Sequence, residues 1–536
     1  MKNWKKALAL ALCALMTASV IAGCGNNTPA QTSSNATDSA TDTSSAAPQE
    51  EHTEIRLTRC LYFGDVSEYQ ELKDEWPKMM KEKYGVDIKV NALARNEYIQ
   101  KVNLLITSSS VDGIVSMFGS SDVWGYREQG VIDPIDQYLK DNENWNKLPQ
   151  IMREQYKKDD GTWALPAGYT QNLFTRTIRQ DWLDNLGLSV PTNTDELYEV
   201  AKAFTLNDPD KNGKNDTYGL TASGTWNLQD IFQAFGARLG SSGDQAITYD
   251  PQAGAWVDNM LKPEMVEALT YLNKMYKEGI LDPELFSNKG SNMRDNIYSC
   301  KYGSTFYWLG FSGDALPLTQ KNDPNAKFTE IPYLKGKLDS QINYIWGSGT
   351  PYILIKGTKD GDKMINEFVN LMYSSEEATL DCAFGISGKT YRVDGNTIYK
   401  MIDPATGAAF QNPGLTGLTP DLTDKFTILP DELSDTDKAA AIALSDFKKS
   451  VFESGLKDGG LYVVEEKNIT PDSATYLAIQ GDISTTFETA ISTAITGAVP
   501  VEKALETYRS EMKNLGAQKV LDEANAACGY TGSTTY

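Results

Sequence analysis

Histidine is almost absent from this chain, whose 536 residues include one, His52. Serine–histidine catalysis needs a histidine beside the nucleophile, and histidine-bound catalytic metals need one in the metal site. His52 lies in a run of small polar residues that lacks the apolar side chains of a folded core. The sequence therefore argues against both of these catalytic designs.

Cysteines are few and far apart. Cys60, Cys300, Cys382 and Cys528 follow the N-terminal region, and no two cysteines have the CxxC spacing of zinc or thioredoxin-type sites. Two disulfides could form outside a cell, and the spacing leaves their pairing open. Neither a zinc site nor a dithiol redox site is expected.

Positive charge is in short supply. The chain has 50 lysines and arginines against 72 acidic residues, for a net charge of −22. A protein that binds nucleic acid or anionic lipid by charge needs a basic surface. The balance argues against both kinds of partner.

The apolar run at the N-terminus is short, and it is too short to cross a bilayer comfortably. "MKNWKKALALALCALMTASVIAGC" has a basic start, an apolar centre and small residues before Cys24. This pattern predicts a lipoprotein signal peptide over residues 1–23, with lipid joined to the sulfur of Cys24. The alternative is an ordinary secretory signal with a cysteine there by chance. We expect a lipid-anchored protein on the outer face of a bacterial cytoplasmic membrane.

Residues 24–53 consist mainly of Ser, Thr, Ala, Asn, Asp and Gln. Such a segment cannot bury enough apolar surface to fold, so it is predicted to be a disordered tether. A flexible chain of this length reaches about 30 Å. Folded structure is expected from residue 54 onward.

The folded part begins with alternating strand and helix patterns. Strand-like runs at 55–63, 86–93 and 112–118 are separated by segments of helical period, the first of which contains Pro77, expected to kink or split its helix. This alternation predicts an α/β fold with parallel strands and right-handed crossovers. In such sheets ligands bind beyond the carboxyl ends of the strands. Further along, Thr194 marks the expected start of a helix through Phe204.

"DPDKNGKND", residues 208–216, has the start of a calcium loop. The expected metal ligands are the side chains of Asp208, Asp210, Asn212 and Asp216 with the backbone carbonyl of Lys214. The glutamate expected at the twelfth position is replaced by Gly219, which argues against a calcium sensor. The motif predicts a structural Ca²⁺ ion, and the alternative is a set of Asx turns without metal.

Three stretches carry a resemblance to a known family: "IAGC" before the tether, "REQGVIDPIDQYL" at 127–139, and residues 179–220, which include the acidic loop. They resemble the extracellular solute-binding proteins, family 1 type, of bacterial carbohydrate ABC importers, and in particular their large lipoprotein subgroup. The likeness covers most of the chain after residue 54 and weakens between 390 and 480.

The resemblance implies a two-lobed, periplasmic-binding-protein-like fold with interlobe crossover strands and a ligand cleft. It places the first lobe at 54–165 and 341–390, and the second at 166–340 and 391–536. It also implies a monomer that captures a carbohydrate, in particular an oligosaccharide, by lobe closure and delivers it to an ABC permease. It further implies a calcium-holding loop at 208–216, like that of alginate-oligosaccharide-binding relatives.

A sugar site needs aromatic rings for the apolar face of the sugar and polar side chains for its hydroxyls. By position at strand ends or in glycine-rich loops, the candidates are Asp65, Arg95, Ser121, Asp122, Trp124, Tyr169, Trp226, Trp308 and Trp346. Resemblance to maltose-binding proteins implies polar contacts near Asp65 and Asp122 and a stacking role for Trp308. Core packing is the alternative for each tryptophan. Arg176 is expected to form an ion pair rather than to bind an acidic sugar.

Other function classes stay open at this stage. A secreted glycan-cleaving enzyme needs only two well-placed carboxylates, which 72 acidic residues could supply, but the chain contains no recognisable catalytic motif. We therefore do not expect an enzyme. A tethered sugar-sensing lipoprotein would have the same ligand chemistry, and a peptide-binding lipoprotein is a further alternative.

Overall fold

The computed structural model describes residues 53–61, 70–94, 97–158, 160–168, 170–171, 174–240, 243–331, 333–337, 341–346, 350–402, 410, 413–431, 442, 461–464 and 470–536. The chain divides into two units, residues 1–51 and 52–536, and the described elements all belong to the second. The predicted signal peptide, Cys24 and nearly all of the tether lie outside the described residues.

The first sheet has the strand order β14-β3-β1-β2. Its strands are β1 (Ile55–Leu61), β2 (Ile88–Ala94), β3 (Ile114–Ser116) and β14 (Tyr352–Leu354). β1 is parallel to β2 and β3, as the strand–helix alternation predicted, and β14 joins β3 in the antiparallel direction. The sheet is therefore built from two distant parts of the chain.

Two apolar clusters cover this sheet. One includes Trp76 of α1 and Phe368 of α13, and the other includes Val102 of α2 and Val123 of α3. The main helices are α1 (Gln70–Tyr84), α2 (Tyr98–Thr107), α3 (Ser120–Glu128), α13 (Gly361–Tyr373) and α14 (Glu376–Phe384). Pro77 does not split α1, which runs on as one helix.

The second sheet has the order β12-β7-β11-β8. Its strands are β7 (Phe174–Arg179), β8 (Tyr218–Leu220), β11 (Tyr302–Trp308) and β12 (Phe328–Ile331). β11 runs parallel to β8 and antiparallel to β7. The carboxyl ends of β8 and β11 and the start of β7 therefore meet at one edge.

Helices from two regions of the chain share the core of the second sheet. They are α7 (Gln180–Leu186), α8 (Thr194–Leu206), α9 (Gln229–Phe235), α10 (Pro263–Lys277), α17 (Ala474–Thr496), α18 (Val501–Leu515) and α19 (Ala517–Ala527). α8 begins where the sequence predicted, with Asn193 rather than Thr194 as its N-cap, because the Asn193 side chain accepts from the backbone N–H of Glu196. A further cluster is built from α11 (Gly290–Tyr298) and α12 (Phe311–Gln320).

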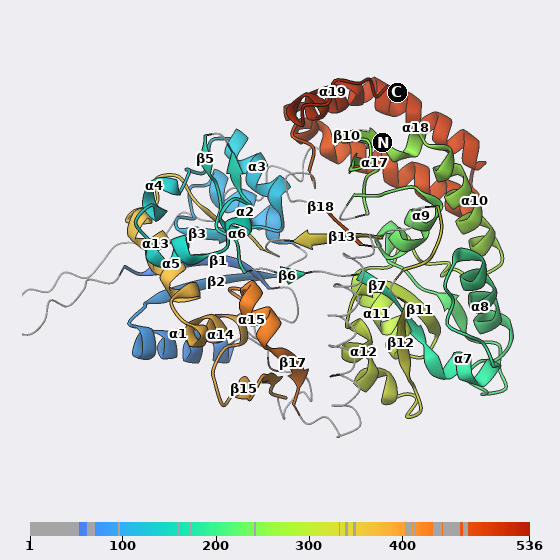
Figure 1. Cartoon of the computed structure of the whole chain (residues 1–536), viewed down its shortest axis with the longest axis horizontal. Helices are drawn as coiled ribbons and strands as arrows, with labels where there is room; N and C mark the ends of the chain where they lie inside the picture. Colours follow the sequence, from blue (N-terminus) through green and yellow to red (C-terminus); the bar gives the residue numbers. More distant parts are fainter. Residues whose placement is uncertain are drawn as a thin grey trace, which may run out of the picture. The chain divides into compact units, whose positions relative to one another are not determined.

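A third sheet contains the segments that pass between the two larger sheets. It has the order β18-β13-β6, with β6 (Thr170–Gln171) antiparallel to β13 (Gln341–Trp346) and β18 (Leu461–Val464) parallel to β13. Figure 1 shows β13 beside β6. β6 leads into β7, and β13 leads back from β12 to β14, so the chain crosses between the sheets more than once.

The segment after residue 390 departs from the prediction. β15 (Tyr391–Asp394), β16 (Thr397–Lys400) and β17 (Thr427–Pro430) form a small sheet that shares an apolar cluster with Phe384 of α14. The Tyr391 hydroxyl donates to Asp381 of α14 at 2.7 Å. The assignment of these three strands, part of the predicted 391–536 segment, to the second lobe is therefore wrong, because a strand pattern does not say which helix its apolar face will cover.

Two remaining expectations concern cysteines and membranes. None of Cys60, Cys300, Cys382 and Cys528 forms a disulfide in the structure, and Cys60 and Cys382 are buried. Within the described ranges, no helix combines the length and the apolar character needed to cross a membrane.

Candidate functional site

Three partly exposed aromatic rings gather at the edge where β8 and β11 end. Trp308 is the last residue of β11 and pairs with Phe174, the first residue of β7. Trp226 lies in the 3-10 helix Gly224–Leu228 that follows β8. The rings of Phe174 and Trp226 meet edge to face, with centroids 5.4 Å apart. We call Phe174, Trp226 and Trp308 the aromatic edge.

A second layer of rings supports the aromatic edge from behind. Tyr307 is 7% exposed, and its ring centroid lies 4.9 Å from that of Trp226 and 4.2 Å from that of Trp308. Trp308 also meets Phe311 at the start of α12. Arg294 of α11 donates to the Tyr307 hydroxyl at 3.0 Å. Because each ring has several neighbours, the exposed faces are held in place before any ligand arrives.

The backbone around Trp226 is fixed by one amide side chain. Asn227 donates to the carbonyl of Phe306 at 2.7 Å and accepts from the backbone N–H of Ser223 at 2.8 Å. These bonds join the turn after β8 to β11. Sequence reasoning singled out Trp226 and Trp308, but it had no local signal for Phe174 or Tyr307, which come to this edge through strand pairing.

In the first lobe, the predicted residues Ser121, Asp122 and Trp124 lie in the first turns of α3, which follows the carboxyl end of β3. Asp122 accepts from the backbone N–H of Phe118 at 3.0 Å, and burial raises the pKa of its carboxyl. Asp122 therefore fixes the backbone just before α3, so its carboxylate has a structural role in addition to any contact with a ligand.

Trp124 is half-buried and has a cation against its ring. Its ring packs on Tyr156 with centroids 6.5 Å apart, and the Lys158 Nζ lies 4.8 Å from the ring centroid. Lys158 Nζ also forms an ion pair with Asp472, at 2.8 Å, just before α17. The surroundings of Trp124 therefore include a residue from the α17 region.

Several predicted binding residues cannot be placed. Asp65, Arg95 and Tyr169 lie outside the described residues. For Trp346 the structure describes the backbone, which pairs with Thr170 in the crossover sheet. The predicted sugar-binding residues whose side chains the structure describes thus lie in two places, the aromatic edge and the start of α3.

Arg176 is not available to a ligand. Its guanidinium donates to both carboxylate oxygens of Asp230, at 2.6 and 2.7 Å, and both side chains are 1% exposed. The expected ion pair is confirmed as an interaction inside the second lobe.

The acidic loop is folded around Asn212. The Asn212 side chain donates to Asp210 at 2.8 Å and to Asp216 at 3.1 Å, and its carbonyl accepts from the backbone N–H of Lys214. Asp208 accepts from the backbone N–H of Gly213, which has a φ of 79° and so needs glycine.

The loop has the oxygen donors that Ca²⁺ prefers, and its charges are close together. Burial, followed by the neighbouring Asp208, raises the pKa of Asp210, and a bound cation would relieve that repulsion. Across the described part of the chain, no three or more His, Cys, Asp or Glu side chains converge in the arrangement of a metal site. The oxygen atoms of this loop are therefore of the kind that binds calcium. In the structure the loop is held by hydrogen bonds among its own side chains and backbone.

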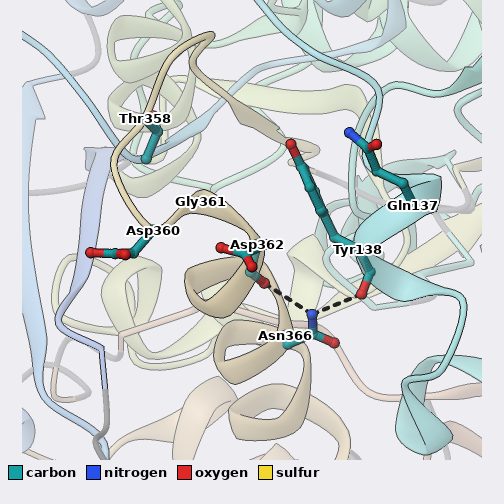
Figure 2. A pocket seen from close by; sticks show the side chains of 7 residues that line it. All are labelled: Gln137, Tyr138, Thr358, Asp360, Gly361, Asp362 and Asn366. Carbon is teal, nitrogen blue, oxygen red and sulfur yellow. Dashed lines mark hydrogen bonds between the residues drawn. The ribbon is translucent and has the colours of Figure 1, made fainter.

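A separate hollow lies between α4 (Asp136–Leu139) and the start of α13. It is lined by Gln137, Tyr138, Thr358, Asp360, Gly361, Asp362 and Asn366 (Figure 2). The Asn366 amide donates to the backbone carbonyls of Tyr138 and Asp362, at 2.7 and 2.9 Å. The hollow has one aromatic ring and two carboxylates, so it lacks the clustered rings of the aromatic edge.

Sequence comparison now decides the family. The family model of the bacterial extracellular solute-binding proteins matches residues 63–379, more than half of the chain. The chain belongs to this family. The match supports the predicted relationship, and the α/β fold with two larger sheets agrees with it.

Among curated proteins, this solute-binding protein is 28% identical over 255 residues to the polygalacturonan/rhamnogalacturonan-binding protein YtcQ of Bacillus subtilis, covering 46% of this chain and 49% of that protein. It is also 28% identical over 230 residues to the lipoprotein LipO of the same organism, covering 41% and 44%. The matched region thus spans about half the length of these curated relatives.

Among solved structures, the Streptococcus pneumoniae ABC-transporter substrate-binding protein FusA in complex with kestose superposes with a TM-score of 0.66. The superposition covers 89% of this chain and 99% of FusA at 17% identity. It shows that this solute-binding protein shares the two-lobed fold.

Proposed function

We propose that this solute-binding protein captures an oligosaccharide and delivers it to an ABC permease. The observation that carries the proposal is the aromatic edge: three ring faces at the carboxyl end of β8 and β11, where ligands of such sheets bind. Rings stack on the apolar faces of sugars, and the names of YtcQ and FusA point to carbohydrate ligands for similar proteins.

The proposed mechanism is closure of the two lobes over the sugar. The crossover strands β6 and β13 provide the connection about which the lobes rotate. A ligand stabilises the closed form only by contacts that the open form lacks. A sugar stacked on the aromatic edge and touching α3 near Trp124 would make such contacts in both lobes.

Two accessory features belong to the proposal. A lipid on Cys24 would hold the protein at the outer face of the cytoplasmic membrane, and the tether would leave the lobes free to reach the permease. A Ca²⁺ ion held by Asp208, Asp210, Asn212, Asp216 and the Lys214 carbonyl would brace the loop between α8 and β8.

Thermal melting of the purified full chain against kestose, mannotriose, xylotriose and trigalacturonate tests the function. A ligand at 100 times its dissociation constant adds about 2.7 kcal/mol, which is a visible shift. We expect a shift with at least one sugar, recovered intact afterwards. Cleaved sugar would mean an enzyme, and no shift with any of the four would overturn the oligosaccharide proposal in favour of a peptide or protein ligand.

A further inference from the structure

A short loop packs directly on the backbone of Trp226. The Thr225 hydroxyl donates to the carbonyl of Gly243. A side-chain carbon on Gly243 would lie 2.7 Å from the Trp226 Cα, so the close approach needs glycine. Asp244 and Gln245 come immediately after this contact, so their backbone follows the point where the loop touches the backbone of Trp226.

Gln245 carries an unused acceptor. Its residue is 8% exposed, its side chain lies against Gly240, and its amide is hydrogen-bonded to the Tyr476 hydroxyl at the start of α17. Its Oε1 is buried and accepts no hydrogen bond from the described residues. A buried polar atom without a partner is costly, and native structures contain few of them.

Asp244 brings a carboxylate to the same place. It is half-buried, and burial raises the pKa of its carboxyl while Glu488 of α17 acts in the same direction. Within the described residues no lysine or arginine forms an ion pair with Asp244. Asp244 and Glu488 therefore act on each other as two neighbouring carboxylates.

The loop also lies on the side of the second lobe that meets the first. Tyr476, which contacts Gln245, follows Asp472 by four residues, and Asp472 pairs with Lys158 at 2.8 Å. Lys158 in turn lies against the ring of Trp124. These contacts, joined by the short stretch of chain from Asp472 to Tyr476, connect the Gln245 side chain to Trp124, the candidate ring of the first lobe.

We propose that Asp244 and Gln245 form a hydroxyl-binding subsite for a neutral sugar unit stacked on Trp226. The inference rests on the proposed function and names its substrate class. An ionised Asp244 accepts two sugar hydroxyls, and the Gln245 carbonyl accepts a third, so the buried acceptor gains its partner from the ligand. A uronate would bring its own carboxylate toward Asp244 and Glu488 and would be repelled.

Calorimetry of the purified full chain with the same four sugars tests the subsite. We expect wild type to bind a neutral trisaccharide more tightly than trigalacturonate. Asp244→Asn should weaken the neutral sugar tenfold or more. Gln245→Met, which keeps a similar side-chain length but removes both the acceptor and the amide bonded to Tyr476, should weaken it several-fold. The matched control is Gln180→Met with Asp184→Asn, a hydrogen-bonded pair on α7, which should bind as wild type.

The outcomes separate the two proposals. If wild type binds a neutral sugar but Gln245→Met and Asp244→Asn bind it equally well, the subsite is wrong and the function stands. Tighter binding of trigalacturonate by wild type also overturns the subsite alone. If wild type binds none of the sugars, both proposals fail. Circular dichroism of each variant checks folding, and Gln245→Met carries the test if Asp244→Asn does not fold.

Discussion

At the scale of single residues, some tryptophans pack in the core and others lie partly exposed at a sheet edge, because the fold places the same residue type in different surroundings. Trp182 and Trp256 are nearly fully buried in the second-lobe core, whereas Trp226 and Trp308 keep part of their rings exposed at a sheet edge. A half-exposed ring with rigid neighbours is suited to stacking, since little is lost on ordering it.

The first prediction concerns Trp308. Trp308→Ala should weaken oligosaccharide binding about tenfold or more, because it removes one stacking face and leaves the hydrogen bonds of β11 intact. Calorimetry with the sugar that binds wild type measures the change. Phe286→Ala is the control, since Phe286 is an exposed ring of the second lobe, 37% accessible, outside the aromatic edge. Equal affinity of Trp308→Ala and wild type would remove Trp308 from the site.

The second prediction concerns the buried pair Arg176 and Asp230. Arg176→Met should lower the free energy of unfolding by about 3–5 kcal/mol, because it leaves a buried carboxylate without its cation. Urea denaturation measures the loss. The double variant Arg176→Met with Asp230→Leu should recover a large part of it. If the single variant is as stable as wild type, the pair does not hold the lobe together.

At the scale of elements, side chains from distant segments complete helices and loops. Glu523 of α19 accepts from the Ser473 hydroxyl at 2.7 Å and from the Thr475 backbone N–H at 3.0 Å, so one helix caps another. These hydrogen bonds lower the pKa of Glu523 to about 2. The capping carboxylate is fifty residues from its helix start in sequence, so no local pattern reveals it.

The third prediction is a pH dependence at this cap. The folded pKa of about 2 lies below the ordinary value of 4.5, so the stabilisation is present above pH 4.5 and is lost as the pH falls toward 2. Glu523→Gln should therefore have a lower melting temperature than wild type at pH 7. The difference between the two melting temperatures should become smaller as the pH falls below 4.5. Glu511→Gln, an exposed change on α18, serves as control. A difference in melting temperature that does not vary with pH would show that the ionised Glu523 carboxylate is not the source of the stabilisation.

The fourth prediction concerns the acidic loop. Removing Ca²⁺ with EGTA should lower the melting temperature while leaving the stoichiometry of sugar binding unchanged, because the loop lies between α8 and β8 and away from the aromatic edge. Asp210→Asn should abolish the chelator effect, since it removes a ligand charge. No response of wild type to EGTA would mean that the loop folds through Asx turns alone.

At the scale of the whole molecule, the chain crosses between two sheets, and such connections permit rotation of one lobe against the other. The crossing is tightly packed at Gly168, where an added side-chain carbon would lie 2.5 Å from the Gly417 backbone. Gly417 lies shortly before α15 (Pro420–Lys425). The chain next to the small β15–β17 sheet therefore also contacts the crossover at this point.

The fifth prediction is closure. Saturating oligosaccharide should reduce the radius of gyration of the full chain in small-angle scattering, because the ligand favours the form in which both lobes contact it. A sugar of the panel that gives no melting shift is the control and should leave the curve unchanged. An unchanged curve with the bound sugar would mean that capture occurs without lobe rotation.

The sequence alone determined what depends on local pattern. Helical period and capping residues located α8 to within two residues at its end, strand–helix alternation predicted the parallel β1, β2 and β3, and the spacing of acidic residues identified the loop at 208–216. These features depend on side chains a few residues apart, whose periodicity is visible in the chain.

Only the tertiary structure decided which distant segments meet. Strand pairing brings Phe174 to Trp308, the turn after β8 adds Trp226, and loop packing brings Gly243 onto the Trp226 backbone. The same long-range choice put Tyr391 and Ile398 beside Phe384 of α14 and gave Arg176 its partner Asp230. Apolar burial is non-directional, so a pattern shows that a face will be covered, and only the packed molecule shows by what.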